Sequence, residues 1–394
     1  MTLVIDERKN LKGQPGLHVL IAGVSAYRYL PIQNESSKPE TLCQLSATAS
    51  TAYKVYSWLL IHQRKLPVPL ATCRLLLSPS IDEVAATPEL NGLADSCILN
   101  NFLLAAKEWR KDAGSNHGNM TFFYFAGHGV QRTKDDAVLL LEDFGDGIGG
   151  LLKNAVDINN IFKGMAKSQA YPNMAQTQLY FVDACRDFLP ELKNYEKADT
   201  TQVFDAELTG EDNRMAPIFF AAAPGTQAHS FRNQTLFSKY LLDCLNGEAG
   251  KFEEEQDLWS VSVYSLSQGL KIKIDDWNEE SEYKQDFVPS GFMKDFDILF
   301  LDQAPKVRVV LSVEPLDALK YTRINILDNG LKPLPELIPF PIPPKRHPYQ
   351  SEWPAGYYTI SAEIVPENPR FVKFPYKSIP VMPPRIKKKI KVTK

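Results

Sequence analysis

Two apolar runs of strand length, each ending in a reactive side chain, constrain the fold more than any other feature of this chain. The first run covers residues 121–127 and leads to His128, and the second covers residues 178–184 and leads to Cys185, 57 residues later. Runs of this length that are rich in aromatic residues are typical of buried strands. If the two strands are parallel neighbours, His128 and Cys185 lie together at the carboxyl edge of the sheet, where open α/β sheets bind ligands.

Segments with strand and helix patterns alternate through residues 17–302. Crossovers of this length between strands predict a mostly parallel sheet covered by helices on both faces. Asp157 is the expected N-cap of one of these helices. We expect strands at residues 18–24, 73–78, 121–127, 138–141, 178–184, 217–223 and 296–301, and helices at residues 47–60, 95–110, 157–166, 235–245 and 259–274.

The composition changes after residue 304. Sixteen of the 28 prolines lie in the last 90 residues, and alternating apolar and polar runs replace the helical patterns. Short alternating strands with proline-rich connections favour a small β-sandwich. The sequence therefore predicts an N-terminal extension (1–16), an α/β domain (17–303) and an all-β domain (305–394), with antiparallel strands at residues 307–313, 321–327, 357–364 and 386–392.

Charge and cysteine content limit the classes of function. The net charge is -3, but residues 1–304 hold 28 Lys and Arg against 40 Asp and Glu, whereas residues 305–394 hold 16 against 7. The basic run at residues 387–391 lacks nearby stacking aromatics, so a basic edge strand is a better interpretation than a nucleic-acid site. Five scattered cysteines, no signal sequence and no apolar run of about 18 residues favour a cytoplasmic protein that binds neither membrane nor nucleic acid.

A thiol beside an imidazole is the minimal apparatus for nucleophilic attack on an amide. His128 lies between two glycines, and Gly129 can present its backbone N–H to a developing oxyanion. Asp183, Arg186 and Asp187 surround Cys185 in the sequence, and Arg186 and His128 could both favour the thiolate. The alternatives are a histidine without a catalytic role and a cysteine that is a small buried hydrophobe.

These motifs resemble those of the caspase and metacaspase superfamily of cysteine peptidases, and most of all its prokaryotic caspase-like members. The resemblance rests on Gly-His-Gly at residues 127–129 and on Asp-Ala-Cys-Arg at residues 183–186. The spacing is close to the caspase pattern, in which the histidine lies about 50 residues before the cysteine. Residues 222–225, 230–233 and 285–289 resemble later parts of the caspase domain, so that the likeness covers about residues 17–302.

The resemblance implies a six-stranded, caspase-like sheet that residues 296–301 close, and peptide-bond cleavage by a Cys–His dyad. In that family pattern Cys185 attacks, His128 protonates the leaving amine, and the amides of Gly129 and Cys185 hold the oxyanion. No metal or organic cofactor is required.

The specificity pocket is expected to contain Asp183, Ser230, Arg232 and Arg28. Asp183 lies two residues before Cys185 on the same face of the strand, and it could bind an Arg or Lys side chain at P1, as in metacaspases. A plain salt bridge from Asp183 to Arg186 or Arg232 is the structural alternative. Residues 49–52 carry no second acid, Ser230 stands where bacterial relatives often carry Glu, and Arg232 could neutralise the pocket. We expect a basic P1 residue, with an uncharged one as the alternative.

The acidic segment 190–216 reads as a surface loop, at the place where caspases carry a processed linker. Candidate self-cleavage sites are Lys193, Lys197 and Arg214, although an ordinary exposed loop fits equally well. Calcium activation is a weaker hypothesis, because the spacing of the loop acids fits no defined calcium loop. Those acids are Asp205, Glu207, Glu211 and Asp212.

The sequence thus predicts a cysteine endopeptidase acting on a specific protein target, with a C-terminal domain that recruits a partner or the substrate. A regulated stress or antiphage role is plausible by analogy alone. The alternative is an inactive caspase-fold scaffold that acts through protein binding. An α/β-hydrolase is excluded, because the chain has no Gly-x-Ser-x-Gly motif.

Overall fold

The computed structural model describes residues 2–32, 42–133, 136–188, 198–207, 212–230, 233–334, 337 and 348–393. The chain packs into two compact units. The first comprises Met1–Leu242 and Lys273–Phe296, and the second comprises Asp243–Ile272 and Asp297–Lys394. The domain limits expected from the sequence stay predictions. No helix in the described ranges has both the length and the apolar character that crossing a bilayer requires.

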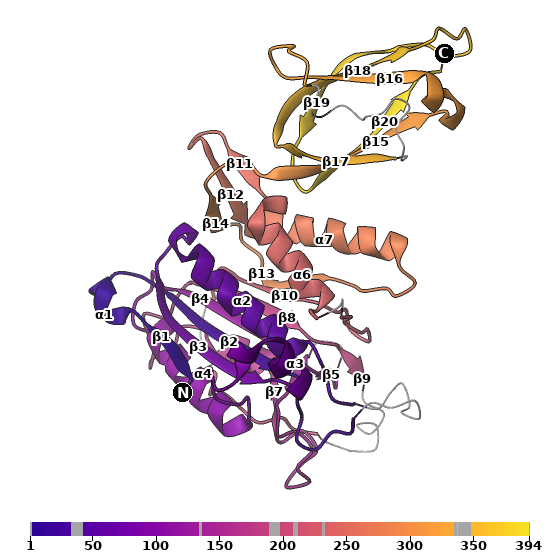
Figure 1. The fold of residues 1–394 in the computed structure, drawn as a ribbon. Coiled ribbons are helices and arrows are strands. Elements are labelled where there is room, and N and C mark those ends of the chain that lie inside the picture. Colours follow the sequence, from indigo (N-terminus) through magenta and orange to yellow (C-terminus); the bar gives the residue numbers. More distant parts are fainter. Residues whose placement is uncertain are drawn as a thin grey trace. The chain divides into compact units, whose positions relative to one another are not determined.

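A seven-stranded sheet forms the centre of the first unit (Figure 1). Its five middle strands are parallel, in the order β3-β2-β4-β8-β10, and an antiparallel strand closes each edge. Strands β2, β3 and β4 are buried along their whole length, which explains their nearly continuous apolar sequences. The strands are β1 (Leu3–Asp6), β2 (Leu17–Val24), β3 (Leu70–Ser78), β4 (Met120–Ala126), β8 (Thr177–Asp183), β10 (Ala216–Phe220) and β13 (Val288–Phe292).

The mostly parallel sheet with flanking helices is confirmed, but the expectations about its edges and strand number are wrong. Residues 3–6 and 288–292 take the two edges, so the sheet has seven strands instead of six. The 288–292 segment contains Pro289 and Gly291 and therefore carries no strand pattern, yet all five of its residues pair with β10. Residues 296–301 do not close the sheet. They form β14 (Asp297–Leu301), which pairs with β12 (Leu258–Ser262) beside β11 (Lys251–Glu253).

Helices α2 and α4 cover opposite faces of the sheet. Leu20 of β2 shares a buried cluster with Phe102 and Trp109 of α4, whereas Gly23 of β2 lies against Ala52 of α2. Alternate residues of a strand point to opposite faces, so β2 is buried from both sides. The α-helices are α1 (Arg8–Leu11), α2 (Thr48–His62), α3 (Ile81–Ala86), α4 (Leu99–Ala113), α5 (Ile158–Gly164), α6 (Leu236–Asp243) and α7 (Val263–Glu280); short 3₁₀ segments cover Gln63–Lys65, Pro88–Leu90 and Leu316–Tyr321, and a π-helical turn covers Cys244–Glu248.

Two details of the helices refine the expectations. The Asp157 side chain caps α5 as expected, because it accepts a hydrogen bond of 2.8 Å from the Asn159 amide. The helix expected at residues 259–274 begins later, at Val263, because residues 258–262 form β12. Since Val261 and Ser260 are buried in that strand, tertiary pairing outweighs the helical spacing there.

A second, four-stranded sheet continues the chain after His128 and Cys185. Its order is β7-β6-β5-β9, and β5 and β9 are parallel neighbours. The two chain segments that carry His128 and Cys185 therefore run side by side both before and after these residues. The strands are β5 (Gly129–Gln131), β6 (Val138–Leu140), β7 (Ala155–Asp157) and β9 (Asp187–Phe188).

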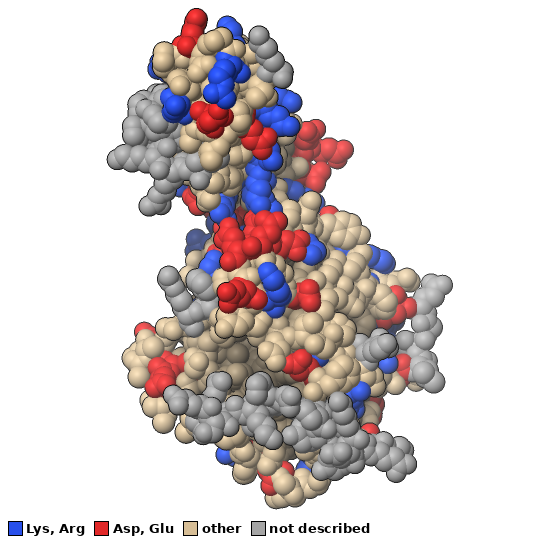
Figure 2. All heavy atoms as spheres, turned by 90° about the vertical axis from the view of Figure 1, so that its right-hand side faces the viewer, with Lys and Arg blue, Asp and Glu red and all other residues tan. Residues whose placement is uncertain are grey.

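The C-terminal residues form two three-stranded sheets, β17-β15-β20 and β16-β18-β19. Both contribute to one buried cluster that includes Val309, Trp353 and Ile360, which is the core of a β-sandwich. Figure 2 shows Lys and Arg side chains spread over this part of the chain. The strands are β15 (Lys306–Glu314), β16 (Thr322–Leu327), β17 (Tyr349–Pro354), β18 (Gly356–Ile364), β19 (Phe374–Val381) and β20 (Arg385–Lys391).

The sandwich differs from the sequence expectation in two ways. The basic strand β20 lies at a sheet edge, but it pairs with β15 in parallel instead of antiparallel. Strands β17 and β19 were not expected, since prolines interrupt or border both of them.

The close packing of β2 on α2 leads to a stability prediction. A Cβ at Gly23 would lie 2.5 Å from the Ala52 Cβ and 2.9 Å from two backbone atoms of α2, so Gly23→Ala forces the helix outward. We expect a loss of about 1–3 kcal/mol in the free energy of unfolding, measured by urea denaturation. Gly150→Ala is the matched control, because that position has open space. Equal unfolding midpoints for the two variants would contradict the packing argument.

Candidate active site

His128 and Cys185 stand level with each other on adjacent chain segments. Before them, β4 and β8 pair in parallel with Ala126 opposite Asp183. After them, β5 and β9 pair in parallel with Val130 opposite Asp187. Both pairs are 57 residues apart in sequence, as are His128 and Cys185, so the register makes these two residues neighbours at the carboxyl edge of the sheet.

Gly129 brings the two segments into close contact. A Cβ at this position would lie 2.4 Å from the Cys185 carbonyl oxygen and 2.8 Å from the Ala184 Cβ, so that only glycine fits. The neighbouring His128 carbonyl accepts a ladder bond of 3.0 Å from the Leu140 amide. Ladder bonds in an antiparallel pair alternate, so the Gly129 N–H points away from β6 and towards the Cys185 side. This is the orientation that an oxyanion donor needs.

The ring of His128 is fixed by groups outside the two motifs. Its Nε2 atom lies 2.6 Å from the carbonyl oxygen of Cys43, and its backbone amide donates to the Tyr27 hydroxyl at 2.7 Å. A carbonyl can only accept, so a neutral His128 carries its proton on Nε2 and keeps a lone pair on Nδ1. Burial lowers the pKa of His128, against a smaller opposing effect of the Cys43 carbonyl. His128 is therefore a neutral base near pH 7.

The thiol of Cys185 is protonated in this structure. Burial raises its pKa to about 11, the Ala228 amide lowers it by a smaller amount, and the charges of Asp187 and Asp183 add to the rise. The sulfur lies 3.3 Å from the amide nitrogen of Ala228 and 3.8 Å from its carbonyl oxygen. Among the contacts of the described residues, no hydrogen bond joins the Cys185 sulfur to the His128 ring. The dyad rests as a neutral pair.

Arg186 is held by contacts with the protein interior, and its expected effect on the thiolate stays a prediction. Its guanidinium is buried, donates to the Asp136 carbonyl at 3.1 Å and stacks over the Phe220 ring at 4.6 Å. These contacts tie the side chain to the protein interior.

Asp183 is buried beside the dyad with one carboxylate oxygen unsatisfied. Tyr124 donates to its Oδ2 atom at 2.7 Å, and the Thr235 hydroxyl donates to the same oxygen. Its Oδ1 atom has no hydrogen-bond partner in the described part of the chain. Burial raises the pKa of Asp183 to about 6, with the two hydroxyls opposing the rise. The Arg186 guanidinium donates to the Asp136 carbonyl, and a salt bridge from Asp183 to Arg186 or Arg232 stays a prediction.

The other residues expected in the specificity pocket are less defined. Arg28 is half-exposed and forms an ion pair of 2.7 Å with Glu142. Ser230 is exposed and bridges to Thr235. Arg232 lies outside the described residues, so its expected roles are neither supported nor opposed here. The structure brings together His128, Gly129, Cys185 and Asp183, and it leaves Arg28 bound to another partner.

Three groups that act at this site could not be found by looking for reactive side chains. Cys43 and Ala228 act through backbone atoms, which no side-chain pattern marks. Tyr27 acts through its hydroxyl. It follows the end of β2 by three residues, so a search for polar residues just beyond strand ends would have included it.

The segment that resembles a processed linker is only partly described. Lys193, Lys197 and Glu211 lie outside the described residues. Arg214 is a poor self-cleavage site, because it is buried and paired with Asp212 at 2.7 Å. Within the described ranges, no three His, Cys, Asp or Glu side chains gather to hold a metal ion. Asp205 and Glu207 instead bind Gln202 and the Gln169 amide.

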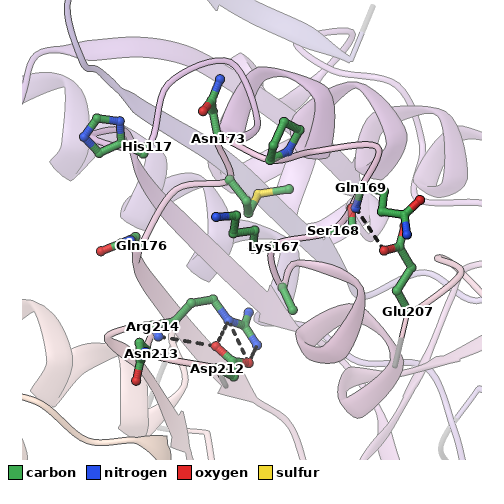
Figure 3. A pocket seen from close by; sticks show the side chains of 13 residues that line it. His117, Lys167, Ser168, Gln169, Asn173, Gln176, Glu207, Asp212, Asn213 and Arg214 are labelled. Atoms are coloured by element: carbon green, nitrogen blue, oxygen red, sulfur yellow. Dashed lines mark hydrogen bonds and ion pairs between the residues drawn. The ribbon is translucent and has the colours of Figure 1, made fainter. Parts of the chain in front are cut away.

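A hollow of about 760 Å³ lies at the other end of the strands. His117 precedes β4, Gln176 precedes β8 and Arg214 precedes β10, so this hollow is at the amino ends of the strands that carry the dyad at their carboxyl ends (Figure 3). Arg214 is saturated by Asp212, the Phe162 carbonyl and Gln178. The hollow has no cysteine in its lining and a neutralised guanidinium, so it is not the site of the thiol chemistry.

Comparison with known proteins agrees with the arrangement of His128 and Cys185. Residues 94–285 match the model of a peptidase family described as Caspase domain. This stretch contains both halves of the candidate dyad. This part of the chain is therefore similar to a caspase domain. The match ends at Gln285, before strand β13.

Solved structures give more distant likenesses. A protein from Geobacter sulfurreducens is 12% identical, with a TM-score of 0.40, and the alignment covers 73% of this chain and 100% of that one. Caspase-1 from Spodoptera frugiperda is 11% identical, with a TM-score of 0.40, and the alignment covers 72% of this chain and 91% of that one. A search of curated proteins gives no match. The likeness to the caspase family therefore rests on the domain match and not on these structures.

The raised pKa of Asp183 leads to a prediction about pH and stability. The folded protein holds this proton with a pKa of about 6, above the ordinary value of 3.8, so the stabilising effect of the proton is complete below about pH 4 and lost as the pH rises through 6. Asp183→Asn removes this titration. We expect the free energy of unfolding of the variant, relative to wild type, to rise by about 3 kcal/mol between pH 4 and pH 7.

Urea denaturation at several pH values measures this difference. Asp199→Asn is the matched control, because Asp199 is exposed. A constant difference between Asp183→Asn and wild type across this pH range would show that Asp183 titrates as an ordinary carboxylate.

Proposed function

We propose that the protein is a cysteine endopeptidase in which Cys185 is the nucleophile and His128 is the general base and acid. The observation that supports the proposal is the shared register of the two segments, which makes residues 128 and 185 neighbours, with Gly129 packed against Cys185. A nucleophile, a base and a glycine amide thus come from adjacent positions of the backbone. The caspase-domain match supports a peptidase of this family.

The proposed reaction uses a neutral dyad. His128 removes the thiol proton while Cys185 attacks the scissile carbonyl carbon, and the proton then passes to the leaving amine as the C–N bond breaks. The amides of Gly129 and Cys185 stabilise the oxyanion. Water, activated by His128, hydrolyses the acyl-enzyme and restores the thiol. Every step uses protein groups and water, so the proposal requires neither metal nor organic cofactor, and calcium activation has no support from the described residues.

Asp183 favours a substrate with Arg or Lys at P1. Its unpartnered Oδ1 atom is buried beside the nucleophile, and a buried carboxylate is costly unless a cation or donor meets it. A P1 cation would provide that partner.

The first test of this function compares wild type with Cys185→Ala on a mixed-sequence peptide pool. Replacing the sulfur removes the nucleophile, so we expect peptide turnover to fall by at least about a thousandfold. Mass spectrometry of the pool measures the cleavage. Cys244→Ala is the matched control, because that cysteine is buried in a helix. Equal turnover by wild type and Cys185→Ala would favour the alternative of an inactive scaffold. An absence of turnover by wild type under every activating condition would favour it as well.

A positional-scanning library tests the P1 preference. If Asp183 binds the P1 cation, wild type cleaves after Arg and Lys, and Asp183→Asn lowers kcat/KM for these substrates by about tenfold to a hundredfold, because one charge-assisted hydrogen bond is lost. Turnover of substrates with uncharged P1 residues should change much less. Wild-type preference for Asp or Leu at P1 would refute the proposal of a basic P1.

We further propose that the protein acts in a reducing compartment, most simply the cytoplasm, on a specific protein target. The five cysteines are all free, which supports this setting. The C-terminal sandwich is a candidate module for recruiting the substrate or a regulatory partner. A regulated role in stress or antiphage defence rests on analogy with caspase-like proteins. An inactive scaffold, the rival function, would not require the close contact between Gly129 and Cys185.

A further inference from the structure

A short segment of the chain, Gly225–His229, crosses directly over the proposed nucleophile. Ala228 in this segment places both its amide and its carbonyl on the Cys185 sulfur, at 3.3 and 3.8 Å. The segment also pairs with the backbone next to the cysteine, because the Arg186 amide donates to the Thr226 carbonyl at 3.0 Å and the Gly225 amide donates to the Arg186 carbonyl at 2.8 Å. Part of the space around the sulfur is therefore filled by the protein's own backbone.

A buried glutamine holds the first end of this segment. The Oε1 atom of Gln131 accepts a hydrogen bond of 3.1 Å from the Gly225 amide, and Gly225 adopts a positive φ of 77° there. Gln131 is fully buried and belongs to β5, two residues after Gly129. Its Nε2 atom has no hydrogen-bond partner among the described residues.

A second buried glutamine holds the other end in the same way. The Oε1 atom of Gln285, which is 1% exposed, accepts a hydrogen bond of 2.9 Å from the His229 amide. Asn278 fixes the backbone of Gln285 on both sides, at 2.9 and 2.8 Å. The imidazole of His229 adds a contact of 2.9 Å to the Lys284 carbonyl. The Nε2 atom of Gln285 also lacks a partner in the described structure.

We propose that Gln131 and Gln285 are positioning residues that clamp the segment Gly225–His229 over the Cys185 sulfur and keep the resting enzyme latent. The inference rests on Cys185 being the nucleophile of the proposed function. In each glutamine only the side-chain oxygen has a hydrogen-bond partner within the described structure, and the nitrogen is buried without one, which costs free energy. Packing alone therefore does not explain why a carboxamide occupies these two positions. The hydrogen bonds to the two ends of the covering segment do explain it.

Opening the clamp changes the site in two ways. Moving Ala228 away exposes the sulfur and reduces the burial that raises the pKa of Cys185, an effect larger than that of the lost Ala228 amide, which lowers this pKa. It also frees the carboxamides of Gln131 and Gln285 to bind other groups. Their unpartnered N–H groups could then donate to the backbone carbonyls of a peptide that takes the place of the segment.

The test compares two substitutions at one position. Gln285→Met keeps the length of the side chain but loses the oxygen that holds His229, whereas Gln285→Glu keeps an oxygen acceptor. The rate of Cys185 alkylation by iodoacetamide at pH 8, followed by mass spectrometry, reports the exposure of the sulfur without any peptidase substrate. We expect Gln285→Met to raise this rate by about fivefold, the effect of losing one hydrogen bond, and Gln285→Glu to stay near wild type. Gln256→Met, at an exposed position, is the matched control.

His229→Ala provides a second variant that does not disturb the core, because it removes only the contacts to Lys284 and Tyr283. We expect it to raise the alkylation rate by a smaller factor, about twofold to threefold. His117→Ala, at an exposed position beyond the opposite end of the strands, is its control. Alkylation of both Gln285→Met and His229→Ala at or below the wild-type rate would overturn the proposal.

Peptide turnover separates this inference from the proposed function. Faster alkylation without turnover in any variant keeps the clamp but refutes the peptidase. The opposite result is turnover by wild type that Cys185→Ala loses, with alkylation rates in Gln285→Met and His229→Ala equal to that of wild type. It would support the peptidase and refute the clamp.

Discussion

The parallel register of β4 and β8 is the constraint on which the rest of the site depends. Seven consecutive residue pairs align these strands, from Met120 opposite Thr177 to Ala126 opposite Asp183. Aromatic side chains make this alignment specific, since Phe122 packs on Phe181 with ring centroids 5.0 Å apart. A slip of one residue would turn every side chain of a strand to the other face, and the sulfur would no longer meet the imidazole. The aromatic runs therefore serve the core and the chemistry at once.

Burial at this edge of the sheet sets the electrostatic state of the site. It raises the pKa values of Cys185 and Asp183 and lowers that of His128, so each group is shifted towards its neutral form. A dry site also strengthens interactions with charge that develops during a reaction. The environment that keeps the thiol inert at rest is thus the environment in which an oxyanion donor such as the Gly129 amide is most effective, once the proton has moved to His128.

The sequence predicted the parts of the structure that depend on repeated apolar patterns and on reactive side chains. It located β2, β4, β8, α2 and α4, and it predicted that residues 128 and 185 are neighbours on adjacent segments of the chain. It failed at the sheet edges, because Leu3–Asp6 is too short to show a pattern and Val288–Phe292 contains proline and glycine. Such segments become strands only because a neighbouring strand offers unpaired backbone groups. The Cys43 carbonyl and the Ala228 amide were missed because backbone groups are identical at every position.

Three buried polar atoms without partners among the described residues belong to Asp183, which lies two residues before the proposed nucleophile, and to the glutamines that bind the segment covering it: Asp183 Oδ1, Gln131 Nε2 and Gln285 Nε2. Unsatisfied groups are uncommon in protein interiors, and departures from good packing concentrate where a second arrangement or a ligand is accommodated. A peptide with a basic P1 residue could supply a cation to Asp183 and carbonyls to the two glutamines. The resting structure would then be less satisfied than the occupied one, and binding free energy could be used to displace Gly225–His229. The three unsatisfied atoms would then have two effects. They would destabilise the state in which Gly225–His229 covers the sulfur, and they would favour the substrate that displaces this segment.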